Sequence, residues 1–366
     1  MASPVPFLQI VHISDLHFMD DTFPAPIRNF VRRWVRSFWP ALHDWILDAT
    51  ALHDPDAPDL FADFLDEITV RSSEPEWANT PTCVVDSGDL TTFGDQASLD
   101  LGWNYLTRLG QGRRLVFIHG NHDAWPSTFP LFASGQSVLG QTSLLGTRYQ
   151  VEIPSAPVTF PIPHGGGEVQ LFTLDSIIHD NYLNSGAWGL VPIVQMDRLS
   201  LLIDSSIHTN KRILRILIIH HPVHYPPPIP FFKYMINQAG VGQRLDSNTP
   251  MGAHPIVHLV LSGHIHAPFP EMGKLPANPQ ACSHPRLGPE QCQLIVGSLM
   301  QADKFGKRGF WPHQCQILRF YYEPSDQSAI FMDRLFAGRG AGLGPYVFVP
   351  DPKGTGALVE RICFSI

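Results

Sequence analysis

The feature that most constrains this chain is a series of five polar motifs, each directly after a short apolar run. The motifs are Asp15-Leu16-His17, Gly88-Asp89, Gly120-Asn121-His122-Asp123, His220-His221-Pro222 and Gly263-His264-Ile265-His266. The runs before them have the length and composition of buried strands. Because ligands in open α/β sheets gather at the carboxyl ends of strands, we expect the five motifs to converge. Histidines are numerous, 18 in all, and many stand at such strand ends, which indicates metal chemistry.

The pattern of apolar runs predicts an α/β architecture. Strands are expected at Phe7–Ile13, Thr82–Val85, Arg114–Ile118, Val169–Leu174, Ile213–Ile219, Ile256–Leu261, Leu294–Val296, Gln316–Tyr322 and Ile330–Phe336. Helical patterns cover Leu60–Ile68, Gln96–Leu109 and Val194–Ser205. Strands that alternate with helices and are then followed by strands alone predict α/β layers completed by an antiparallel portion.

Composition narrows the class of partner. The chain has 366 residues, of which 44% are hydrophobic, so it can bury a full-sized core. Its formal net charge of −8 argues against nonspecific nucleic-acid binding, which needs a basic surface. A phosphate substrate stays open, because metal ions can supply positive charge locally.

The cysteines and the start of the chain bear on location. Five cysteines are scattered without a C-x-x-C pair, which predicts reduced thiols and a cytoplasmic protein rather than a disulfide framework. Residues 1–7 lack the basic and apolar regions of a signal peptide. No run approaches the ~20 apolar residues that a membrane-spanning helix needs.

In their order along the chain, the five motifs resemble those of the calcineurin-like metallophosphoesterase superfamily. The Gly-Asp-Leu-Thr and His-His-Pro forms are most similar to its class III cyclic-nucleotide and glycerophosphodiester phosphodiesterases. The resemblance implies a four-layer αββα sandwich of two mixed β-sheets flanked by helices. We expect this domain over residues 1–336, with a helical insertion at about 20–80 and a proline- and aromatic-rich cap loop at 223–255. Residues 337–366 are expected to be a Gly/Pro-rich C-terminal extension.

The resemblance also implies a ligand set for two metal ions. The first ion would be bound by Asp15, His17 and His266, and the second by Asn121, His220 and His264. Asp89 would bridge them, which suits a carboxylate, since its two oxygens can span two cations ~3.5–4 Å apart. Imidazole and carboxylate ligands without thiolates favour Mn, Fe, Zn, Co or Ni over a structural zinc site. In the His-His pair the family pattern makes His220 the ligand and leaves His221 to pack or to bind a neighbouring group.

His122 is the expected catalytic histidine. It directly follows a ligand, so it should face the phosphate, where it could stabilise transition-state charge or protonate the leaving group. In the protein-phosphatase branch an aspartate three residues after the bridging aspartate orients this histidine. Here that position is Thr92, which puts a protein-phosphatase role in doubt, and Asp123 or Asp95 could substitute. Other histidines in or beside strands, such as His12, are expected to hydrogen bond rather than bind metal.

These inferences predict a hydrolase that acts on a small phosphoester. The expected reaction is phosphodiester hydrolysis by attack of a metal-bound hydroxide, with His122 assisting the departing alcohol. Three alternatives stay open: a pyrophosphatase acting on nucleotide-linked lipids or alcohols, a phosphomonoesterase, and an inactive scaffold of the same fold.

One segment lies outside this scheme. Residues 30–46 place apolar side chains on one helical stripe and Arg32, Arg33 and Arg36 on the other side, with Pro40 as a kink. We expect this helix to pack on its own domain or at a homodimer interface. The alternative is peripheral membrane contact that brings the site to lipid headgroups.

Overall fold

The structure of the protein is a computed structural model. It covers residues 5–18, 56–71, 74–92, 94, 96–124, 156–163, 167–177, 188–207, 212–224, 235–246, 257–265, 292–299, 314–323, 326–339, 344–349, 357 and 359–365. The expected helix at 30–46, Asp95 and His266 lie outside these ranges. Homodimer formation and membrane contact through 30–46 therefore stay predictions.

The first sheet combines parallel and antiparallel strands. It contains β1 (Val5–Ile13), β2 (Thr82–Asp86), β3 (Arg114–Phe117), β9 (Cys315–Glu323), β10 (Asp326–Arg339), β11 (Tyr346–Phe348) and β12 (Val359–Ser365). The order is β11-β10-β9-β1-β2-β3, and β12 also pairs with β10. The neighbours β1, β2 and β3 are parallel, whereas β9 to β12 are joined antiparallel. The expected antiparallel portion at the end of the chain is confirmed.

The second sheet is mainly parallel. It contains β4 (Val158–Ile162), β5 (Gly167–Leu174), β6 (Ile213–Ile219), β7 (Leu259–Ser262) and β8 (Cys292–Ile295), in that order. Only β4 pairs antiparallel, with β5. The mostly apolar sequences of β6 and β7 follow from their burial, because a parallel strand covered on both faces has no polar side.

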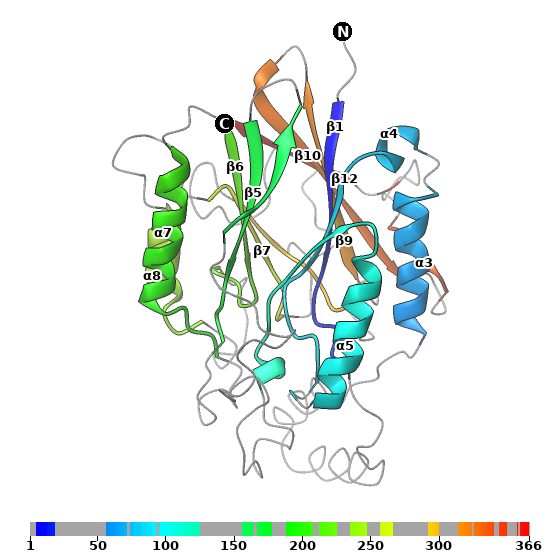
Figure 1. Cartoon of the computed structure of the whole chain (residues 1–366), viewed down its shortest axis with the longest axis horizontal. Coiled ribbons are helices and arrows are strands. Elements are labelled where there is room, and N and C mark those ends of the chain that lie inside the picture. Colours follow the sequence, from blue (N-terminus) through cyan, green and yellow to red (C-terminus); the bar gives the residue numbers. More distant parts are fainter. Residues whose placement is uncertain are drawn as a thin grey trace.

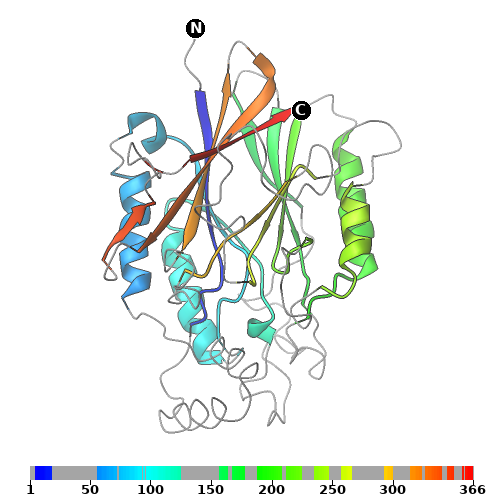
Figure 2. The same cartoon turned by 180° about the vertical axis from the view of Figure 1, so that it is seen from behind.

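Helices cover the outer faces of both sheets (Figures 1 and 2). On the first sheet lie α3 (Ala57–Thr69), the short α4 (Pro75–Ala78) and α5 (Gln96–Leu109), and on the second lie α7 (Ile193–Ile207) and α8 (Gln238–Asp246). One apolar cluster fills the space between the sheets and two more join the sheets to their helices. The predicted four-layer sandwich of two mixed sheets flanked by helices is confirmed.

Strand β1 contributes side chains to two apolar clusters, one on each face of the first sheet. Leu8 and Ile10 point into the core between the sheets, whereas Val11 and Ile13 pack under α3 and α5. This alternation is the period of two that a strand imposes on its side chains. Burial on both faces explains why β1 reads as a continuous apolar run rather than as an alternating one.

Two expectations about connections need correction. The sequence predicts a loop over 223–255, but α8 forms within it, because Val241 and Leu245 bury one helical turn apart against the second sheet. The sequence predicts a Gly/Pro-rich extension over 337–366, but β10 continues to Arg339 and then pairs with β11 and β12. Short strands next to glycine carry little local signal, and it is pairing with β10 that orders them. The domain boundaries themselves stay a prediction.

No helix among the described residues is long and apolar enough to cross a membrane. The cytoplasmic location expected from the cysteines stays a prediction.

Candidate metal centre

The five motifs meet where parallel strands of the two sheets end. In the first sheet, the motifs of Asp15, Asp89 and Asn121 follow β1, β2 and β3, which lie side by side. In the second sheet, the motifs of His220 and His264 follow β6 and β7, which are also neighbours. The predicted convergence is confirmed for the part of each motif that the structure describes. Because the carboxyl ends of parallel strands point the same way, each sheet delivers its motifs to one edge.

The loops after β1 and β2 are bonded to each other through their main chains. Asp15 N–H donates to Gly88 O and His17 N–H donates to Asp89 O, both at 2.9 Å. The pairing continues beyond the motif as a bridge between Phe18 and Thr91. Asp15, His17 and Asp89 are therefore held at fixed relative positions by backbone hydrogen bonds.

Four of the predicted ligands have left-handed backbone conformations. The φ angles are 55° at Asp15, 52° at His17, 57° at Asp89 and 71° at His264. Such angles are uncommon for residues with a Cβ atom, and they cost of order 1–3 kcal/mol each. This backbone strain occurs at residues of the motifs. It is expected where the surrounding structure must direct several side chains to a common point.

Asp89 lies at the centre of the cluster. Its Oδ1 accepts a hydrogen bond from the His122 amide at 2.9 Å. Its Oδ2 is buried, accepts no hydrogen bond from the described residues, and lies 3.3 Å from Nε2 of His220. The Nε2 atoms of His17 and His122 are each 4.0 Å from the same oxygen. One carboxylate oxygen thus faces three imidazoles, which is the position expected of a bridging ligand.

His220 is oriented by both of its ring nitrogens. Its Nδ1 donates to the carbonyl of Ser87 at 2.9 Å, which directs Nε2 toward Asp89 and places it 3.1 Å from Oδ1 of Asn121. Burial alone would lower the pKa of His220, but the carboxylates of Asp89 and Asp15 outweigh it and raise the pKa to about 9. A protonated His220 therefore offsets part of the negative charge of Asp89 and Asp15.

His221 has a different environment. Its Nδ1 bonds to the hydroxyl of Ser176 at 2.8 Å, and its ring packs at 4.3 Å between centroids on the ring of His264. A side chain on Gly189 would collide with the same ring. Sequence reasoning gave His221 no definite role and missed Ser176, which follows β5 without any motif. The bonds that hold His221 leave His220 as the histidine of the pair nearest Asp89.

The orientation of His122 comes from a main-chain group. Its Nδ1 lies 3.0 Å from the carbonyl oxygen of Thr92, and since a carbonyl only accepts, Nδ1 carries the proton. This leaves Nε2 4.0 Å from Oδ2 of Asp89, and the rings of His122 and His17 pack nearly perpendicular with their centroids 4.6 Å apart. The aspartate of protein phosphatases is replaced here by the backbone of the same position. No side-chain pattern could have revealed that partner.

Asp123 does not orient His122. Its carboxylate accepts hydrogen bonds from the amides of Leu90, Thr91 and Gly120 and from the Thr91 hydroxyl, at 2.7–3.1 Å. Burial would raise the pKa of Asp123, but His119 and these amides outweigh it and lower the pKa. Asp123 therefore ties the loop after β3 to the loop after β2. The alternative that it substitutes for the missing aspartate is wrong.

Glycines let the loops approach this closely. A Cβ atom on Gly120 would collide with the Asp89 carboxylate, and one on Gly263 would collide with the Ser14 hydroxyl. Gly88 has a φ of 110°, which residues with a Cβ rarely adopt. The glycines that precede the predicted ligands are therefore required by close contact, and Gly88 is required by its backbone conformation as well.

The donor set fits transition-type metal ions. Three groups of side chains have ligand atoms within 4.8 Å of one another: His17, Asp89 and His122; Asp15, Asp89 and His220; and His220, His221 and His264. The groups overlap at Asp89 and His220, so they form one continuous cluster. Buried imidazoles and carboxylates at these separations are the ligands that Mn, Fe, Zn, Co and Ni accept.

The fold is similar to solved structures of low sequence identity. They include a 5'-nucleotidase precursor from Thermus thermophilus (14% identity, TM-score 0.38, 98% of this chain and 54% of that one). Two others are the Thermus thermophilus sulfate thiohydrolase SoxB in complex with glycerol (12%, 0.39, 100% and 58%) and the Haemophilus influenzae NAD nucleotidase NadN (10%, 0.38, 96% and 55%). This chain thus spans little more than half the length of each of these proteins.

Comparison with curated proteins gives no match. Comparison with family models does, and the matched region contains all five motifs. The model of the calcineurin-like phosphoesterase family matches residues 8–268, well over half of the chain, so this protein belongs to that family of metal-dependent hydrolases.

Proposed function

We propose that the protein is a dinuclear metal-dependent phosphodiesterase. The observation that carries this proposal is the position of Asp89 Oδ2, buried within 4.0 Å of the Nε2 atoms of His17, His122 and His220. A protonated His220 offsets the charge of this carboxylate only in part, because the carboxylate of Asp15 belongs to the same buried group, so further cations would stabilise the site. Two ions bridged by Asp89 would supply that positive charge.

The proposed ligands divide between the two sheets. Asp15 and His17 with His266 would hold one ion, and Asn121, His220 and His264 would hold the other. When bound, such ions neutralise phosphate charge and lower the pKa of a coordinated water toward neutrality. Hydrogen bonds within the chain hold these ligands in place. The Ser87 carbonyl fixes the ring of His220, and the Asp15 carboxylate accepts a hydrogen bond from the His264 amide at 3.1 Å.

His122 is the proposed acid for the departing alcohol. It is 5% exposed, so its ring lies at the edge of the buried cluster, where a substrate could reach it. The Thr92 carbonyl holds Nδ1–H, and Nε2 is left as the atom that gives a proton to the leaving oxygen. The ring would still be held in this pose after the transfer, because the Nδ1 proton is not the one that moves.

A diester fits the charge of the site better than a monoester. A monoester dianion carries one more negative charge and gains from cationic side chains around the phosphate, as Arg clamps provide in phosphoryl transfer. None of the five motifs contains arginine or lysine. A diester monoanion needs less compensation, and its alkoxide leaving group can take the proton that it needs from His122.

A substrate panel with metal-loaded protein tests the proposal. Elemental analysis after loading with Mn or Zn should approach two equivalents per chain. We expect a larger kcat/KM near neutral pH for bis-p-nitrophenyl phosphate than for p-nitrophenyl phosphate, and likewise for a glycerophosphodiester over its monoester. Because aryl leaving groups are poor substitutes for an alkoxide, both pairs are needed.

The panel also separates the alternatives. A preference for the monoester in both pairs would make the protein a phosphomonoesterase while keeping the metal site. Turnover confined to a nucleotide pyrophosphate would make it a pyrophosphatase. Two bound ions without turnover of any ester would indicate an inactive scaffold, and a metal content near zero would contradict the whole proposal.

A further inference from the structure

A line of buried polar side chains runs from the C-terminal strand to the loop that carries Asp89. In order, its members are Glu360, Arg334, Gln316, His12 and Ser87. All are between 0% and 6% exposed, although they come from β12, β10, β9, β1 and the loop after β2. Buried polar groups are costly unless each is hydrogen bonded, so a continuous line of five of them points to a specific role.

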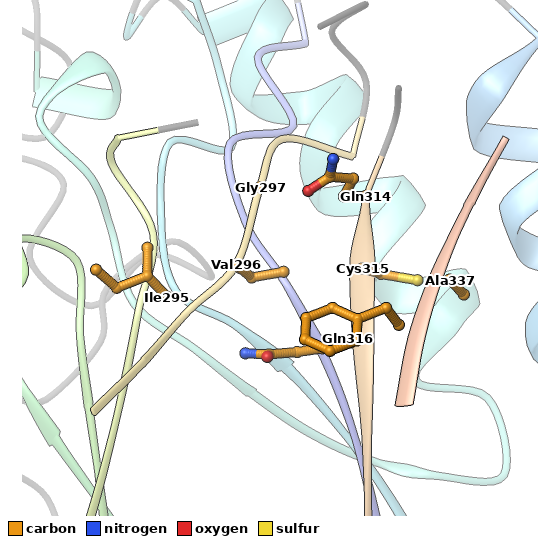
Figure 3. Close-up of a pocket in the computed structure, with 8 residues that line it drawn as sticks. Ile295, Val296, Gly297, Gln314, Cys315, Gln316 and Ala337 are labelled. Atoms are coloured by element: carbon orange, nitrogen blue, oxygen red, sulfur yellow. The ribbon is translucent and has the colours of Figure 1, made fainter. Parts of the chain in front are cut away.

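Arg334, the second member of the line, also joins the two sheets. Its Nη1 lies 3.3 Å from Oε2 of Glu360, its cross-strand neighbour on β12. Its Nη2 donates to the carbonyl of Ile295 on β8, in the other sheet, at 3.1 Å. Its Nε donates to Oε1 of Gln316 at 2.5 Å. Ile295 and Gln316 line the same small pocket between the sheets (Figure 3).

The guanidinium gives the line a direction. Arginine can only donate, so the amide oxygen of Gln316 must face Arg334. The amide NH₂ of Gln316 then faces Nδ1 of His12, 2.5 Å away, and makes Nδ1 an acceptor. His12 must carry its proton on Nε2, which donates to the Ser87 hydroxyl at 2.9 Å. One charged group thus selects the tautomer of a histidine two residues further along the line.

Ser87 connects the line to the candidate metal centre. Its carbonyl accepts the Nδ1 hydrogen bond that orients His220, while its hydroxyl is held by His12. The next two residues in the chain are Gly88 and the proposed bridging ligand Asp89. A shift of Ser87 would therefore turn the ring of His220 and move Asp89 together.

We propose that Arg334 and Gln316 are positioning residues of the metal centre. They set the direction of the hydrogen bonds that hold Ser87, whose carbonyl orients the ring of His220. This inference rests on the proposed function, since it requires that His220 bind a metal ion. It gives the C-terminal part of the first sheet, which supplies none of the five motifs, a role in aiming a ligand.

A near-isosteric substitution tests the direction of the line. Gln316→Glu keeps the shape and the bond from Arg334, but a carboxylate can only accept. Nδ1 of His12 would then have to carry a proton. In a neutral His12 this leaves Nε2 as an acceptor, so the Ser87 hydroxyl would have to turn round and donate to Nε2. The contacts stay in place while the polarity at Ser87 is reversed, which separates positioning from packing.

Gln9→Glu is the matched control. Gln9 is also buried, lies on β1 three residues before His12, and accepts from a buried arginine, with Arg319 Nε 3.1 Å from its Oε1. Both substitutions bury one more carboxylate against a buried arginine of a neighbouring strand, Arg319 on β9 for Gln9 and Arg334 on β10 for Gln316. Only Gln316 is bonded to His12.

The experiment has two readouts. In ¹⁵N spectra of histidine-labelled, metal-free protein, the His12 signal, identified by its loss in His12→Gln, should report protonated Nε2 in wild type and protonated Nδ1 in Gln316→Glu. Metal titration should show weaker binding of one of the two ions in Gln316→Glu by about 10–100-fold, the usual effect of losing a partner of a metal-bound histidine. Gln9→Glu should match wild type in both.

The outcomes distinguish the two proposals. Wild-type metal affinity in Gln316→Glu, an unchanged His12 tautomer, or an equal loss of affinity in Gln9→Glu would overturn this inference and leave the metal centre intact. Wild-type protein that binds no metal would overturn the proposed function and the inference together.

Discussion

The loops after β1 and β2 bond to each other through their main chains, whereas the loops after β6 and β7 reach the first sheet largely through side chains. Asp15 and His17 are each fixed by an amide that donates to the neighbouring loop. His220 instead depends on its ring bond to the Ser87 carbonyl, and the amide of His264 depends on the carboxylate of Asp15. The first half of the site is therefore specified within one sheet, and the second half requires that the two sheets be correctly packed.

The largest effect should come from the residue that both halves share. Asp89→Ala removes the oxygen that faces His17, His122 and His220, so both ions should be lost together. We expect kcat/KM to fall by more than the ~10–100-fold that is usual for losing a mere partner of a ligand. Elemental analysis alongside kinetics checks this. Retention of one full equivalent of metal would show that the halves bind their ions independently.

The next largest effect should separate catalysis from metal binding within the first half. His122→Ala should keep both ions and lower kcat by about 10²–10⁴, the usual contribution of a general acid. His220→Ala, the matched ligand variant, should lose metal as well as turnover. If the two variants lost metal equally, His122 would be a ligand and its proposed role as an acid would be wrong.

A smaller effect on stability and metal binding should appear where Gly263, after β7, packs against Ser14 and Asp15, after β1. Gly263→Ala would drive a methyl group into the Ser14 hydroxyl and to 2.7 Å from Oδ2 of Asp15. We expect a loss of about 1–3 kcal/mol in the free energy of unfolding, as for other overpacked sites, with weaker binding of the ion assigned to His220 and His264. Urea titration and metal titration measure the two effects.

Gly240→Ala is the control for that variant. Gly240 lies in α8 and no described atom lies within 4 Å of an added Cβ. This change should raise stability by about 0.5–1 kcal/mol, because alanine loses less backbone entropy in a helix. Equal metal affinity in the two glycine variants would argue that the contact of Gly263 with Ser14 and Asp15 does not position His220 and His264.

The last effect is a dependence of the free energy of unfolding on pH, which comes from His12 on β1. Burial and the charge of Arg334 lower the pKa of His12 from 6.5 to about 3, and Asp15 opposes this only in part. The unfolded chain therefore binds the proton more readily than the folded one. The stability from neutral His12 is complete above pH 6.5 and is lost as the pH falls toward 3, by about 1.4 kcal/mol per pH unit.

Comparison with His12→Gln isolates this slope, since glutamine offers an acceptor and a donor but does not titrate. Urea unfolding of both proteins at pH 7, 6 and 5, with a chelator present, should give a steeper loss of stability in wild type. Parallel slopes would mean that His12 is protonated in the folded protein, against the hydrogen-bond direction derived from Arg334.

The sequence was sufficient where local pattern and position agree. The bounds of α5 and β6 match the prediction because long, strongly patterned runs leave little choice of structure. The convergence of Asp15, Asp89 and Asn121 could be predicted because neighbouring parallel strands must end at one edge. By contrast, α8, β11 and β12 have weak local signals and form because a larger neighbouring surface covers them.

What the sequence determined by itself is the chemistry of the centre: which residue types follow which strands, and hence the family, the donor set and the candidate acid. Only the tertiary structure decided how those side chains are aimed. The Thr92 carbonyl that holds His122, the Ser87 carbonyl that holds His220 and the line from Arg334 to His12 join positions 18–304 residues apart. Main-chain carbonyls are present at every position, so which of them accepts a given bond depends on the packing of the two sheets rather than on any motif.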